Sequence, residues 1–446
     1  MLIRFVVDNV LSFGERKEFN MLPNPRLGTL SHHKYSSGDF SYLKMASVYG
    51  ANAAGKSNLV KSIALLKDLV HGEISTSRVK RTQFKLRKAD LPQLLALEFL
   101  QDGIPFYYGV EITDGRISTE ELYISGLGKE DRLIFERKIN ANSLSTLKFN
   151  EDFEKDEKSS LLKSLLEDFI QPSETALKIL AQRAGEHLKE IPKAFEWFQA
   201  LQVVTPNAKP GGLAHTIDTD IDFKCYAEDT IKSFGIGISE LHVDKANVKE
   251  VYSDEEVDKI EEIFADIKDS NKEFVADSRG NVIAADGSEI VVKQLALKHK
   301  GKDGVVSFSL DEESDGTVRL LDLIPAFRSI FLKKKVFIID EIERSIHPLL
   351  IKELVKRFSL DEQTQGQLIF TTHESSLLDQ EIFRQDEIWF AEKNNEGVTD
   401  LYSLSDFKEH KTIDIRKGYL TGRYGAIPFL ANLENLNWHG YASEKK

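Results

Sequence analysis

Cysteine is almost absent from this sequence, since Cys225 is the only one among 446 residues. One thiol can form neither a disulfide within the chain nor a metal site built from several cysteines, so we expect a reducing cytoplasm. Long apolar runs are missing too, because no stretch approaches the about 18 uninterrupted apolar residues of a membrane-spanning helix. The opening residues, MLIRFVVDNV, lack the basic leader and cleavage site of a signal peptide. The sequence therefore predicts a cytoplasmic protein that does not cross a membrane.

Positive charge is also in short supply. The chain has 59 Lys and Arg residues against 72 Asp and Glu, a formal net charge of −13, which argues against a surface that grips nucleic acid everywhere. The charge is uneven, however, with a net +5 over residues 76–90 and −8 over residues 251–290. Each segment has two open interpretations, a solvated face or a surface for nucleic acid or a protein partner. The basic residues of the first segment are Arg78, Lys80, Arg81, Lys85, Arg87 and Lys88.

The sequence contains a complete phosphate-binding loop. Residues 50–57 read Gly-Ala-Asn-Ala-Ala-Gly-Lys-Ser, which matches the pattern G-x-x-x-x-G-K-S. Gly50 and Gly55 let the backbone curl so that successive N–H groups point at one anion. Lys56 brings positive charge to the outer phosphates, and Ser57 offers its hydroxyl to Mg²⁺. We therefore expect a site for a nucleoside triphosphate and Mg²⁺, with a chance glycine-rich turn as the alternative.

The residues on both sides of this loop fit the motif. Residues 45–49 read as a short buried strand, and the apolar residues of 58–70 recur at helical spacing. In the order strand, loop, helix, the positive end of the helix faces the phosphates. This is the structural context that the motif requires.

Three segments of the chain differ in their patterns, as its length suggests for two or three domains. Residues 1–150 read mainly as strands, with Asp102-Gly103 and Asp114-Gly115 as hairpin turns of an antiparallel meander. Residues 151–270 read as a mostly helical insertion without the sustained heptads of a long coiled coil. Residues 271–446 alternate strands and helices, which predicts a parallel sheet covered by helices. We expect the two outer segments to build one nucleotide site.

Two acids end an apolar run in the last segment. Residues 336–339 read Val-Phe-Ile-Ile, as a buried parallel strand does, and ligands bind at the carboxyl ends of such strands. Asp340 is therefore expected to reach Mg²⁺ opposite Ser57, and Glu341 to orient and polarise the attacking water. The alternative is a core strand that happens to end in acids.

Two further candidate site segments lie before and after the acid strand in the sequence. The buried strand 368–372 is followed by His373, which we expect to sense the γ-phosphate by a hydrogen bond. The turn Ser-Asp-Gly-Thr at residues 314–317 precedes a helix, and its Ser314 and Gly316 could bind a second anion, belonging to another chain's nucleotide. Ser314 is equally suited to be an ordinary helix N-cap.

These motifs together resemble the ABC-type ATPases of the SMC and RecF group, and more closely the RloA and AbiL type of ATPase from bacterial phage-defence loci. The tail, residues 419–428, also looks like that family's end, and so does the opening, with Leu-Ile-Arg-Phe at 2–5, Leu-Ser-Phe at 11–13 and Phe-Asn-Met-Leu-Pro at 19–23. The residues that carry the resemblance are Asn52, Asn58, Ser-Asp-Gly-Thr at 314–317, Ile-Ile-Asp-Glu at 338–341, Ser-Ile-His-Pro at 345–348 and Thr-Thr-His at 371–373.

The resemblance implies an α/β ABC-type ATPase head, with a mixed or antiparallel N-terminal lobe, a parallel RecA-like core and a mostly helical insertion. It implies ATP and Mg²⁺ as cofactors, bound also by Asn52 and Asn58, and a head-to-tail dimer with two sandwiched ATP molecules. In such a dimer Ser314 and Gly316 contact the γ-phosphate in trans, and His347 lies in a loop that crosses the interface. The signature departs from the Ser-Gly-Gly-Gln of transporter-type ATPases, and Gln83 is the candidate for the Mg²⁺-sensing glutamine.

Three functions follow from this resemblance. The first is a dimeric ATP-driven switch of an anti-phage system, triggered by DNA or a phage-derived signal. It would control a separate effector such as a Toprim-like nuclease, because residues 379–446 are too few for a nuclease domain of about 100 residues. The second is a DNA-repair ATPase that binds DNA directly, which the basic segment supports and the net acidity opposes. The third is a transporter's nucleotide-binding subunit, which the insertion and the signature oppose.

Overall fold

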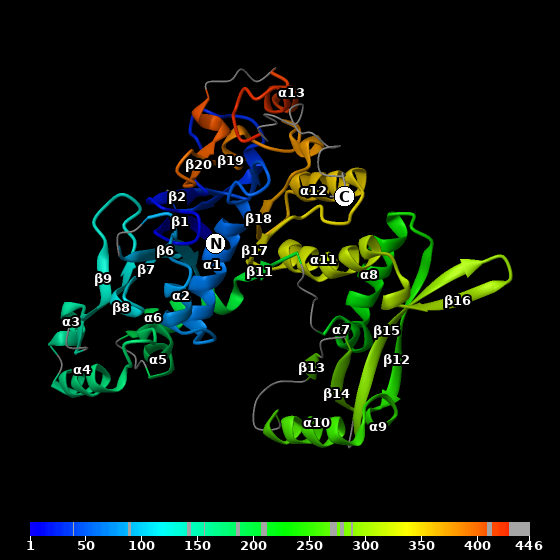
Figure 1. The fold of residues 1–446 in the computed structure, drawn as a ribbon, viewed down its shortest axis with the longest axis horizontal. Coiled ribbons are helices and arrows are strands. Elements are labelled where there is room, and N and C mark those ends of the chain that lie inside the picture. The colour runs from blue at the N-terminus through cyan, green and yellow to red at the C-terminus, as the bar shows by residue number, and fades with distance from the viewer. Residues whose placement is uncertain are drawn as a thin grey trace, which may run out of the picture. The chain divides into compact units, whose positions relative to one another are not determined.

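The computed structural model divides the chain into two compact units (Figure 1). Unit 1 comprises Met1–Val203 and Gln367–Lys446, and unit 2 comprises Val204–Gly366. Lys88 of the basic segment and Pro428 of the family-like tail lie outside the residues that the structure describes. The described residues are 1–38, 40–87, 91–140, 144–155, 157–183, 188–206, 212–267, 274–276, 281–286, 289–407 and 413–427.

An antiparallel sheet forms one part of unit 1, with the strand order β10-β9-β8-β7-β6-β1-β2. Asp102-Gly103 and Asp114-Gly115 form the predicted two-residue turns, and all four residues have positive φ angles between 49° and 79°, as the tight hairpin turns favoured by Asp-Gly require. The antiparallel meander is therefore confirmed. The strands are β1 (Leu2–Asp8), β2 (Lys17–Asn20), β6 (Gln93–Gln101), β7 (Ile104–Thr113), β8 (Arg116–Ile124), β9 (Arg132–Ile139) and β10 (Ser145–Phe149).

A parallel sheet carries the phosphate-binding loop in the same unit. Its central strand β5 (Met45–Tyr49) is fully buried and has the bounds that the sequence predicts. Strands β18 (Gln367–Thr371) and β19 (Ile388–Lys393) run parallel to β5 on either side of it, and β20 (Thr399–Ser403) adds an antiparallel edge to β19. Helix α1 (Lys56–His71) follows the loop. Together with the antiparallel lobe, this parallel core gives the predicted α/β fold class.

Shorter elements complete unit 1. Glu120 of β8 is fully buried and accepts hydrogen bonds from the first two N–H groups of α5, those of Ala176 and Leu177, at 2.7 and 3.0 Å. This carboxylate thus attaches the helices to the antiparallel sheet at a helix N-terminus, where an anion is favourable. The elements are β3 (Lys34–Ser37), β4 (Phe40–Leu43), α2 (Thr76–Lys80), α3 (Glu151–Glu154), α4 (Glu157–Phe169), α5 (Ala176–Arg183), α6 (Glu190–Ala200) and α13 (Ile415–Leu420).

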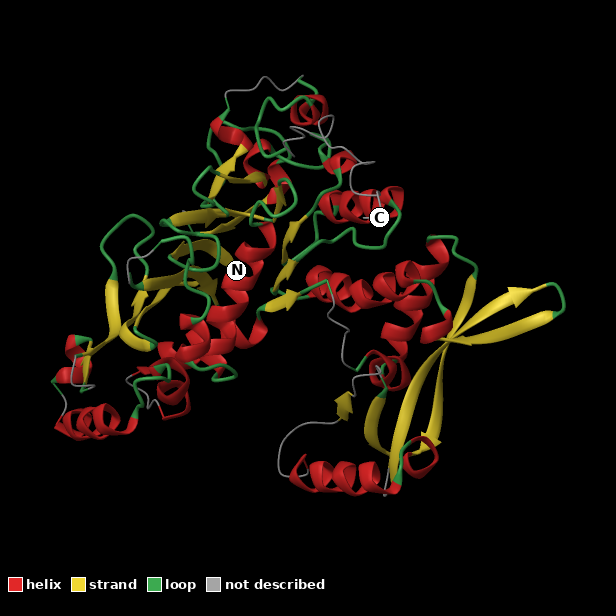
Figure 2. Ribbon diagram, in the orientation of Figure 1, coloured by secondary structure: helices red, strands yellow, loops and turns green. Residues whose placement is uncertain are grey.

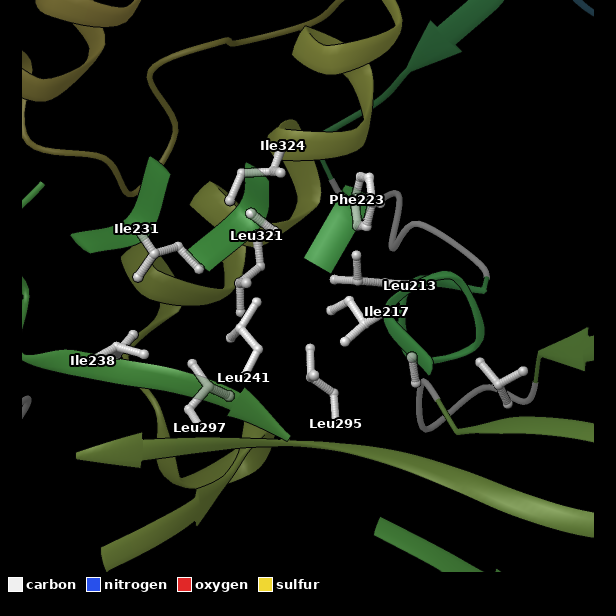
Figure 3. Close-up of a cluster of buried hydrophobic side chains, with 13 residues drawn as sticks. Leu213, Ile217, Phe223, Ile231, Ile238, Leu241, Leu295, Leu297, Leu321 and Ile324 are labelled. Atoms are coloured by element: carbon white, nitrogen blue, oxygen red, sulfur yellow. The ribbon is translucent and has the colours of Figure 1, made fainter. Parts of the chain in front are cut away.

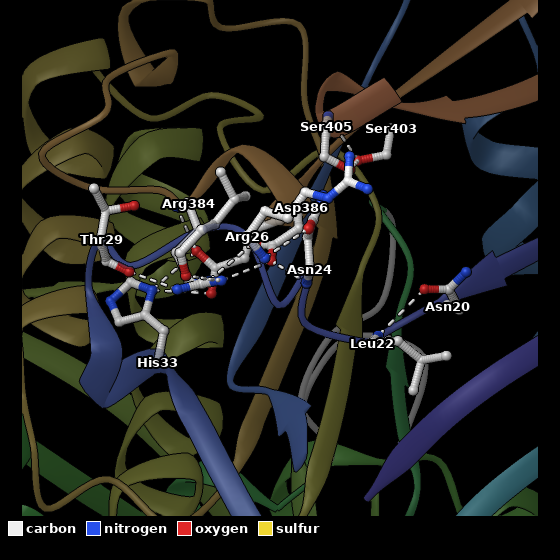
Figure 4. A network of polar contacts seen from close by, with 12 residues as sticks. Asn20, Leu22, Asn24, Arg26, Thr29, His33, Arg384, Asp386, Ser403 and Ser405 are labelled. Carbon is white, nitrogen blue, oxygen red and sulfur yellow. Dashed lines mark hydrogen bonds and ion pairs between the residues drawn. The ribbon is translucent and has the colours of Figure 1, made fainter. Parts of the chain in front are cut away.

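A buried polar network fixes the start of β19 (Figure 4). The Arg384 guanidinium binds both carboxylate oxygens of Asp386, at 2.9 and 2.7 Å, and donates to the backbone carbonyl of Thr29. Asp386 also accepts the backbone N–H of Asn24 at 2.7 Å. The Arg384 side chain is fully buried. Its contacts and those of Asp386 hold the 24–33 loop against the turn that leads into β19.

Unit 2 contains a second antiparallel sheet, with the order β12-β15-β14-β13 and β16 paired to β15. Figure 2 shows its long strands in yellow beside helices in red. Residues 238–243, 291–298 and 305–310 read as strands in the sequence and correspond to β12, β15 and β16. The sequence misses β13 and β14, which are short and alternate poorly between apolar and polar residues. The elements are α7 (Leu213–Thr219), α8 (Ile221–Ser233), β12 (Ile238–Asn247), α9 (Val248–Val251), α10 (Asp254–Ile267), β13 (Phe274–Ala276), β14 (Val282–Asp286), β15 (Glu289–Gly301) and β16 (Gly304–Ser309).

Helix α11 (Asp315–Leu332) packs on the core of unit 2. Leu321 and Ile324 of α11 join apolar side chains of α7, α8, β12 and β15 in one cluster (Figure 3). The buried strand β17 (Val336–Ile339) follows, and then α12 (Pro348–Leu360). Short strand β11 (Gln202–Val204) ends beside β17, since the Asp340 N–H donates to the Val204 carbonyl at 2.9 Å. No helix in the described part of the chain is long and apolar enough to cross a bilayer.

Candidate nucleotide-binding site

The loop of residues 50–57 has the backbone of an anion site. Gly55 is the residue before α1 and has φ = 112°, and Ala53 also has a positive φ of 61°. Positive φ angles that recur in this way along a short loop turn N–H groups toward one side, and the first N–H groups of α1 have no partner within their own helix. Asn52 is exposed and Ser57 half-buried, so both predicted contacts stay within reach of a ligand.

The Lys56 side chain folds back onto the start of this loop. Its ammonium donates to the carbonyls of Gly50 and Ala51 at 2.8 and 3.0 Å, and its Nζ lies 3.4 Å from Nδ1 of His373. The side chain is only 4% exposed. His373 directly follows the buried Thr372 beyond the end of β18. Two predicted site residues that are 317 positions apart in sequence are thus brought together.

A set of hydrogen bonds supports the loop from behind. The Thr399 hydroxyl donates to the Ala54 carbonyl at 2.9 Å, and its oxygen lies within hydrogen-bond distance of the Ser12 hydroxyl, at 2.7 Å. The Asn58 side-chain amide donates to the same Ser12 oxygen at 2.7 Å. Asn58, predicted to contact the nucleotide, therefore lies against the loop's supporting network. Gln83 forms an isolated β-bridge with Val10, two residues before Ser12.

The predicted acids lie in unit 2, directly after β17. Asp340 is 2% exposed and Glu341 is half-buried. Glu341 has φ = 50°, a left-handed conformation that is uncommon for a residue with a side chain and that turns the backbone sharply at the end of the strand. Such angles collect at functional sites, where surrounding structure maintains them.

The Ser-Asp-Gly-Thr turn lies against the loop that follows these acids. Ser314 is exposed and is the N-cap of α11, accepting the Thr317 N–H at 3.2 Å. A Cβ on Gly316 would come within 2.6 Å of the Ser345 carbonyl oxygen, so only glycine permits this approach. The exposed His347 caps α12 through its Nδ1, which accepts the Leu349 N–H at 3.2 Å. The signature turn and the predicted interface loop are therefore neighbours.

The predicted residues thus fall into two groups. Unit 1 holds the glycines of the loop, Lys56, Ser57, Asn52, Asn58 and His373, and unit 2 holds Asp340, Glu341, Ser314, Gly316 and His347. The donor set of unit 1, an ammonium with backbone N–H groups, fits the phosphates of a nucleotide. Among the described residues no three His, Cys, Asp or Glu side chains cluster in a way that could hold a metal ion.

Sequence patterns miss the residues that support these groups. Ser12 lies in the Leu-Ser-Phe run of the family-like opening, but no pattern predicts a role for it or for Thr399. The two meet only through the fold, since 387 positions separate them. Arg319 is another such residue, buried in α11 close to the acids. In the sequence, Arg319 is distinguished only as a single basic residue between the signature turn and the apolar pair Leu320-Leu321.

Among solved structures, the fold is similar to SMC head domains. The SMC head domain from Thermotoga maritima matches with 12% identity and a TM-score of 0.40, covering 90% of this chain and 98% of that one. A SmcHead bound to the C-winged helix domain of ScpA has 14% identity and a TM-score of 0.43, with coverages of 90% and 97%. A Smc head with an extended coiled coil, bound to the C-terminal domain of ScpA derived from Pyrococcus furiosus, has 12% identity and a TM-score of 0.43. The match covers 95% of this chain and 98% of that one. No match was found among curated proteins.

A sequence family, in contrast, matches more than half of the chain. Its profile aligns with residues 45–170 and 236–379, which include the phosphate-binding loop, the signature turn, the acid strand and His373. The family is described as "AAA domain, putative AbiEii toxin, Type IV TA system". This chain is a member of that family of AAA domains.

Proposed function

We propose that this chain is an ATP-binding and ATP-hydrolysing switch of a bacterial anti-phage system, which works as a head-to-tail dimer and controls a separate effector. The observation that carries the proposal is the contact of Lys56 with His373 at the phosphate-binding loop, because both residues would then face the terminal phosphate of a bound nucleotide. The family description, which names a toxin of a type IV toxin–antitoxin system, supports a role in defence. A Toprim-like nuclease is the kind of effector that we expect.

Each residue has a distinct task in this proposal. Lys56 and the N–H groups at the start of α1 would bind the phosphates, and His373 would hydrogen-bond the γ-phosphate. Ser57 and Asp340 would hold Mg²⁺, which supplies charge neutralisation between the outer phosphates when it is bound. Glu341 would accept a proton from the attacking water. Ser314 and Gly316 would complete the partner subunit's site.

Two substitutions test the ATPase part. Lys56→Ala should abolish binding of a fluorescent ATP analogue, whereas Lys61→Ala, an exposed lysine of the same helix, should bind normally. Glu341→Gln should bind ATP and remain a dimer in size-exclusion chromatography, with turnover reduced about 100-fold or more. Glu353→Gln, an exposed acid of α12, is its control. Full turnover in Glu341→Gln would remove this residue from the role of base.

The defence role needs a separate test in cells. The chain and the product of the neighbouring open reading frame would be expressed together, and phage plating would be measured. We expect protection with both proteins, and none with either alone or with Lys56→Ala. Equal protection by the chain alone would show that no separate effector is required.

Direct DNA binding, as in a repair ATPase, is the second candidate. Arg78, Lys80, Arg81 and Lys85 are all exposed, around the short helix α2. Lys80, however, forms an ion pair with Asp114 at 3.0 Å, which lowers the positive charge offered to phosphates. Salt-sensitive DNA binding by the chain alone, lost on reversing Arg78, Lys80 and Arg81, would favour this candidate.

A further inference from the structure

Arg319 is a buried charge whose hydrogen-bonding capacity is largely unused. It lies in the second turn of α11 and is 4% exposed. Its Nη1 makes one long contact with the Thr205 carbonyl, at 3.5 Å. Its Nε and Nη2 are buried and have no hydrogen-bond partner in the described part of the chain. Buried unpaired donors destabilise a fold, so this arginine is not explained by stability.

The guanidinium lies in the field of the predicted catalytic acids. Burial lowers the pKa of Arg319 from its ordinary value, the carboxylates of Asp322, Glu341 and Asp340 raise it, and Arg344 lowers it. The backbone agrees with this placement, because Thr205, which Arg319 contacts, follows Val204, and Val204 accepts the Asp340 N–H. Arg319 is therefore close to the end of β17, which Asp340 and Glu341 directly follow.

Arg319 shares a rigid element with the signature turn. Ser314 and Gly316 form the N-terminal end of α11, and Arg319 follows within about one turn of helix. Leu321 and Ile324 anchor the helix in the apolar cluster of unit 2 (Figure 3). Since a helix moves as a body, a shift of the signature turn that tilts α11 about this anchor would also move the Arg319 side chain.

We propose that Arg319 is a positioning residue that couples the two nucleotide sites of the dimer. When Ser314 and Gly316 engage the partner's nucleotide, Arg319 brings its free donors to the carboxylates of Asp340 and Glu341 and orients them for the subunit's own nucleotide. The inference rests on the proposed function. An arginine suits this role, because its planar fork can hold two carboxylate oxygens at once.

The experiment compares Arg319→Met, Arg319→Lys and a control, Arg328→Met. Arg328 lies on the same helix and pairs with Asp220 at 3.0 Å, away from the acids. Thermal midpoint, ATP affinity, kcat and the Hill coefficient for ATP are measured for each full-length protein. For Arg319→Met we expect a raised midpoint, an ATP affinity within twofold of wild type, a kcat at least tenfold lower and a Hill coefficient near one. Arg319→Lys should recover part of kcat, and Arg328→Met should keep both kcat and the Hill coefficient.

The outcomes separate a coupling role from a structural one. A lower midpoint in Arg319→Met, with kcat and the Hill coefficient unchanged, would overturn the inference while the proposed ATPase stands. If Arg319→Met does not fold, Arg319→Lys decides, since wild-type kcat and cooperativity in that variant contradict a need for the arginine fork. A wild-type protein without ATP turnover, or with turnover that shows no cooperativity between sites, would overturn the coupling; absence of turnover would overturn the proposed function as well.

Discussion

Replacing Gly55 by alanine should destabilise unit 1 through two separate effects. The first is conformational, because Gly55 has φ = 112°, a region that is unfavourable for any residue with a Cβ by about 1–3 kcal/mol. The second is steric, because the new Cβ would lie 2.2 Å from Oγ1 and 2.6 Å from Cγ2 of Thr399. Thr399 is fully buried, so it cannot move aside without strain of about 1–3 kcal/mol. We expect a total loss of about 2–6 kcal/mol.

Gly128→Ala isolates the steric part of this loss. Gly128 has φ = 93° and no atom within 4 Å of its Cβ position, so its substitution should carry only the conformational effect of about 1–3 kcal/mol. Urea unfolding followed by tryptophan fluorescence reports on unit 1, because Trp197 and Trp389 lie in it and unit 2 has no tryptophan. Equal stabilities of Gly55→Ala and Gly128→Ala would refute the claim that Thr399 closes the back of the loop.

Three other substitutions test single contacts. Arg384→Met should lower the free energy of unfolding by about 3–5 kcal/mol in the same urea assay, because it leaves the buried Asp386 carboxylate without its charged partner. Thr399→Val keeps the shape but removes the hydroxyl that donates to Ala54, so we expect a loss of about 1–3 kcal/mol and weaker binding of the ATP analogue in a fluorescence titration. Burial, helped by Lys67, lowers the pKa of His71 below its ordinary value of 6.5. The unfolded chain then binds that proton more tightly, so stability should fall as pH drops below 6.5, and His71→Gln should show a shallower fall in urea midpoints measured between pH 7 and pH 5.

Local patterns predicted the elements that carry the motifs. Strands β5 and β17 have the bounds given in the sequence analysis, because each is a short, mainly apolar run that ends at a glycine or an acid. The two Asp-Gly turns were also predictable, since few residue pairs tolerate two successive positive φ angles. The short strands β13 and β14 were not, because three to five residues are too few to show a period.

The supporting contacts could not be predicted, because they join residues that are far apart in sequence. The proximity of Thr399 to Ser12 and the position of Arg319 beside the acids depend on how strands and helices pack, and no spacing in the sequence encodes them. The Lys56–His373 contact could be predicted in part. Each residue was identified by the strand that precedes it, and the parallel pairing of β5 with β18 explains why they meet.

The structure also changes the reason for one glycine of the phosphate-binding loop. The motif assigns both Gly50 and Gly55 to the curl of the backbone around an anion. Gly50, however, does not have a positive φ, and a Cβ there would lie 2.3 Å from the Ala391 carbonyl oxygen of β19. Gly50 is therefore required by packing of the loop on its neighbouring strand, and Gly55 by both packing and conformation. A substitution at Gly50 would impair nucleotide binding by displacing the loop from β19, even though no phosphate contact is removed.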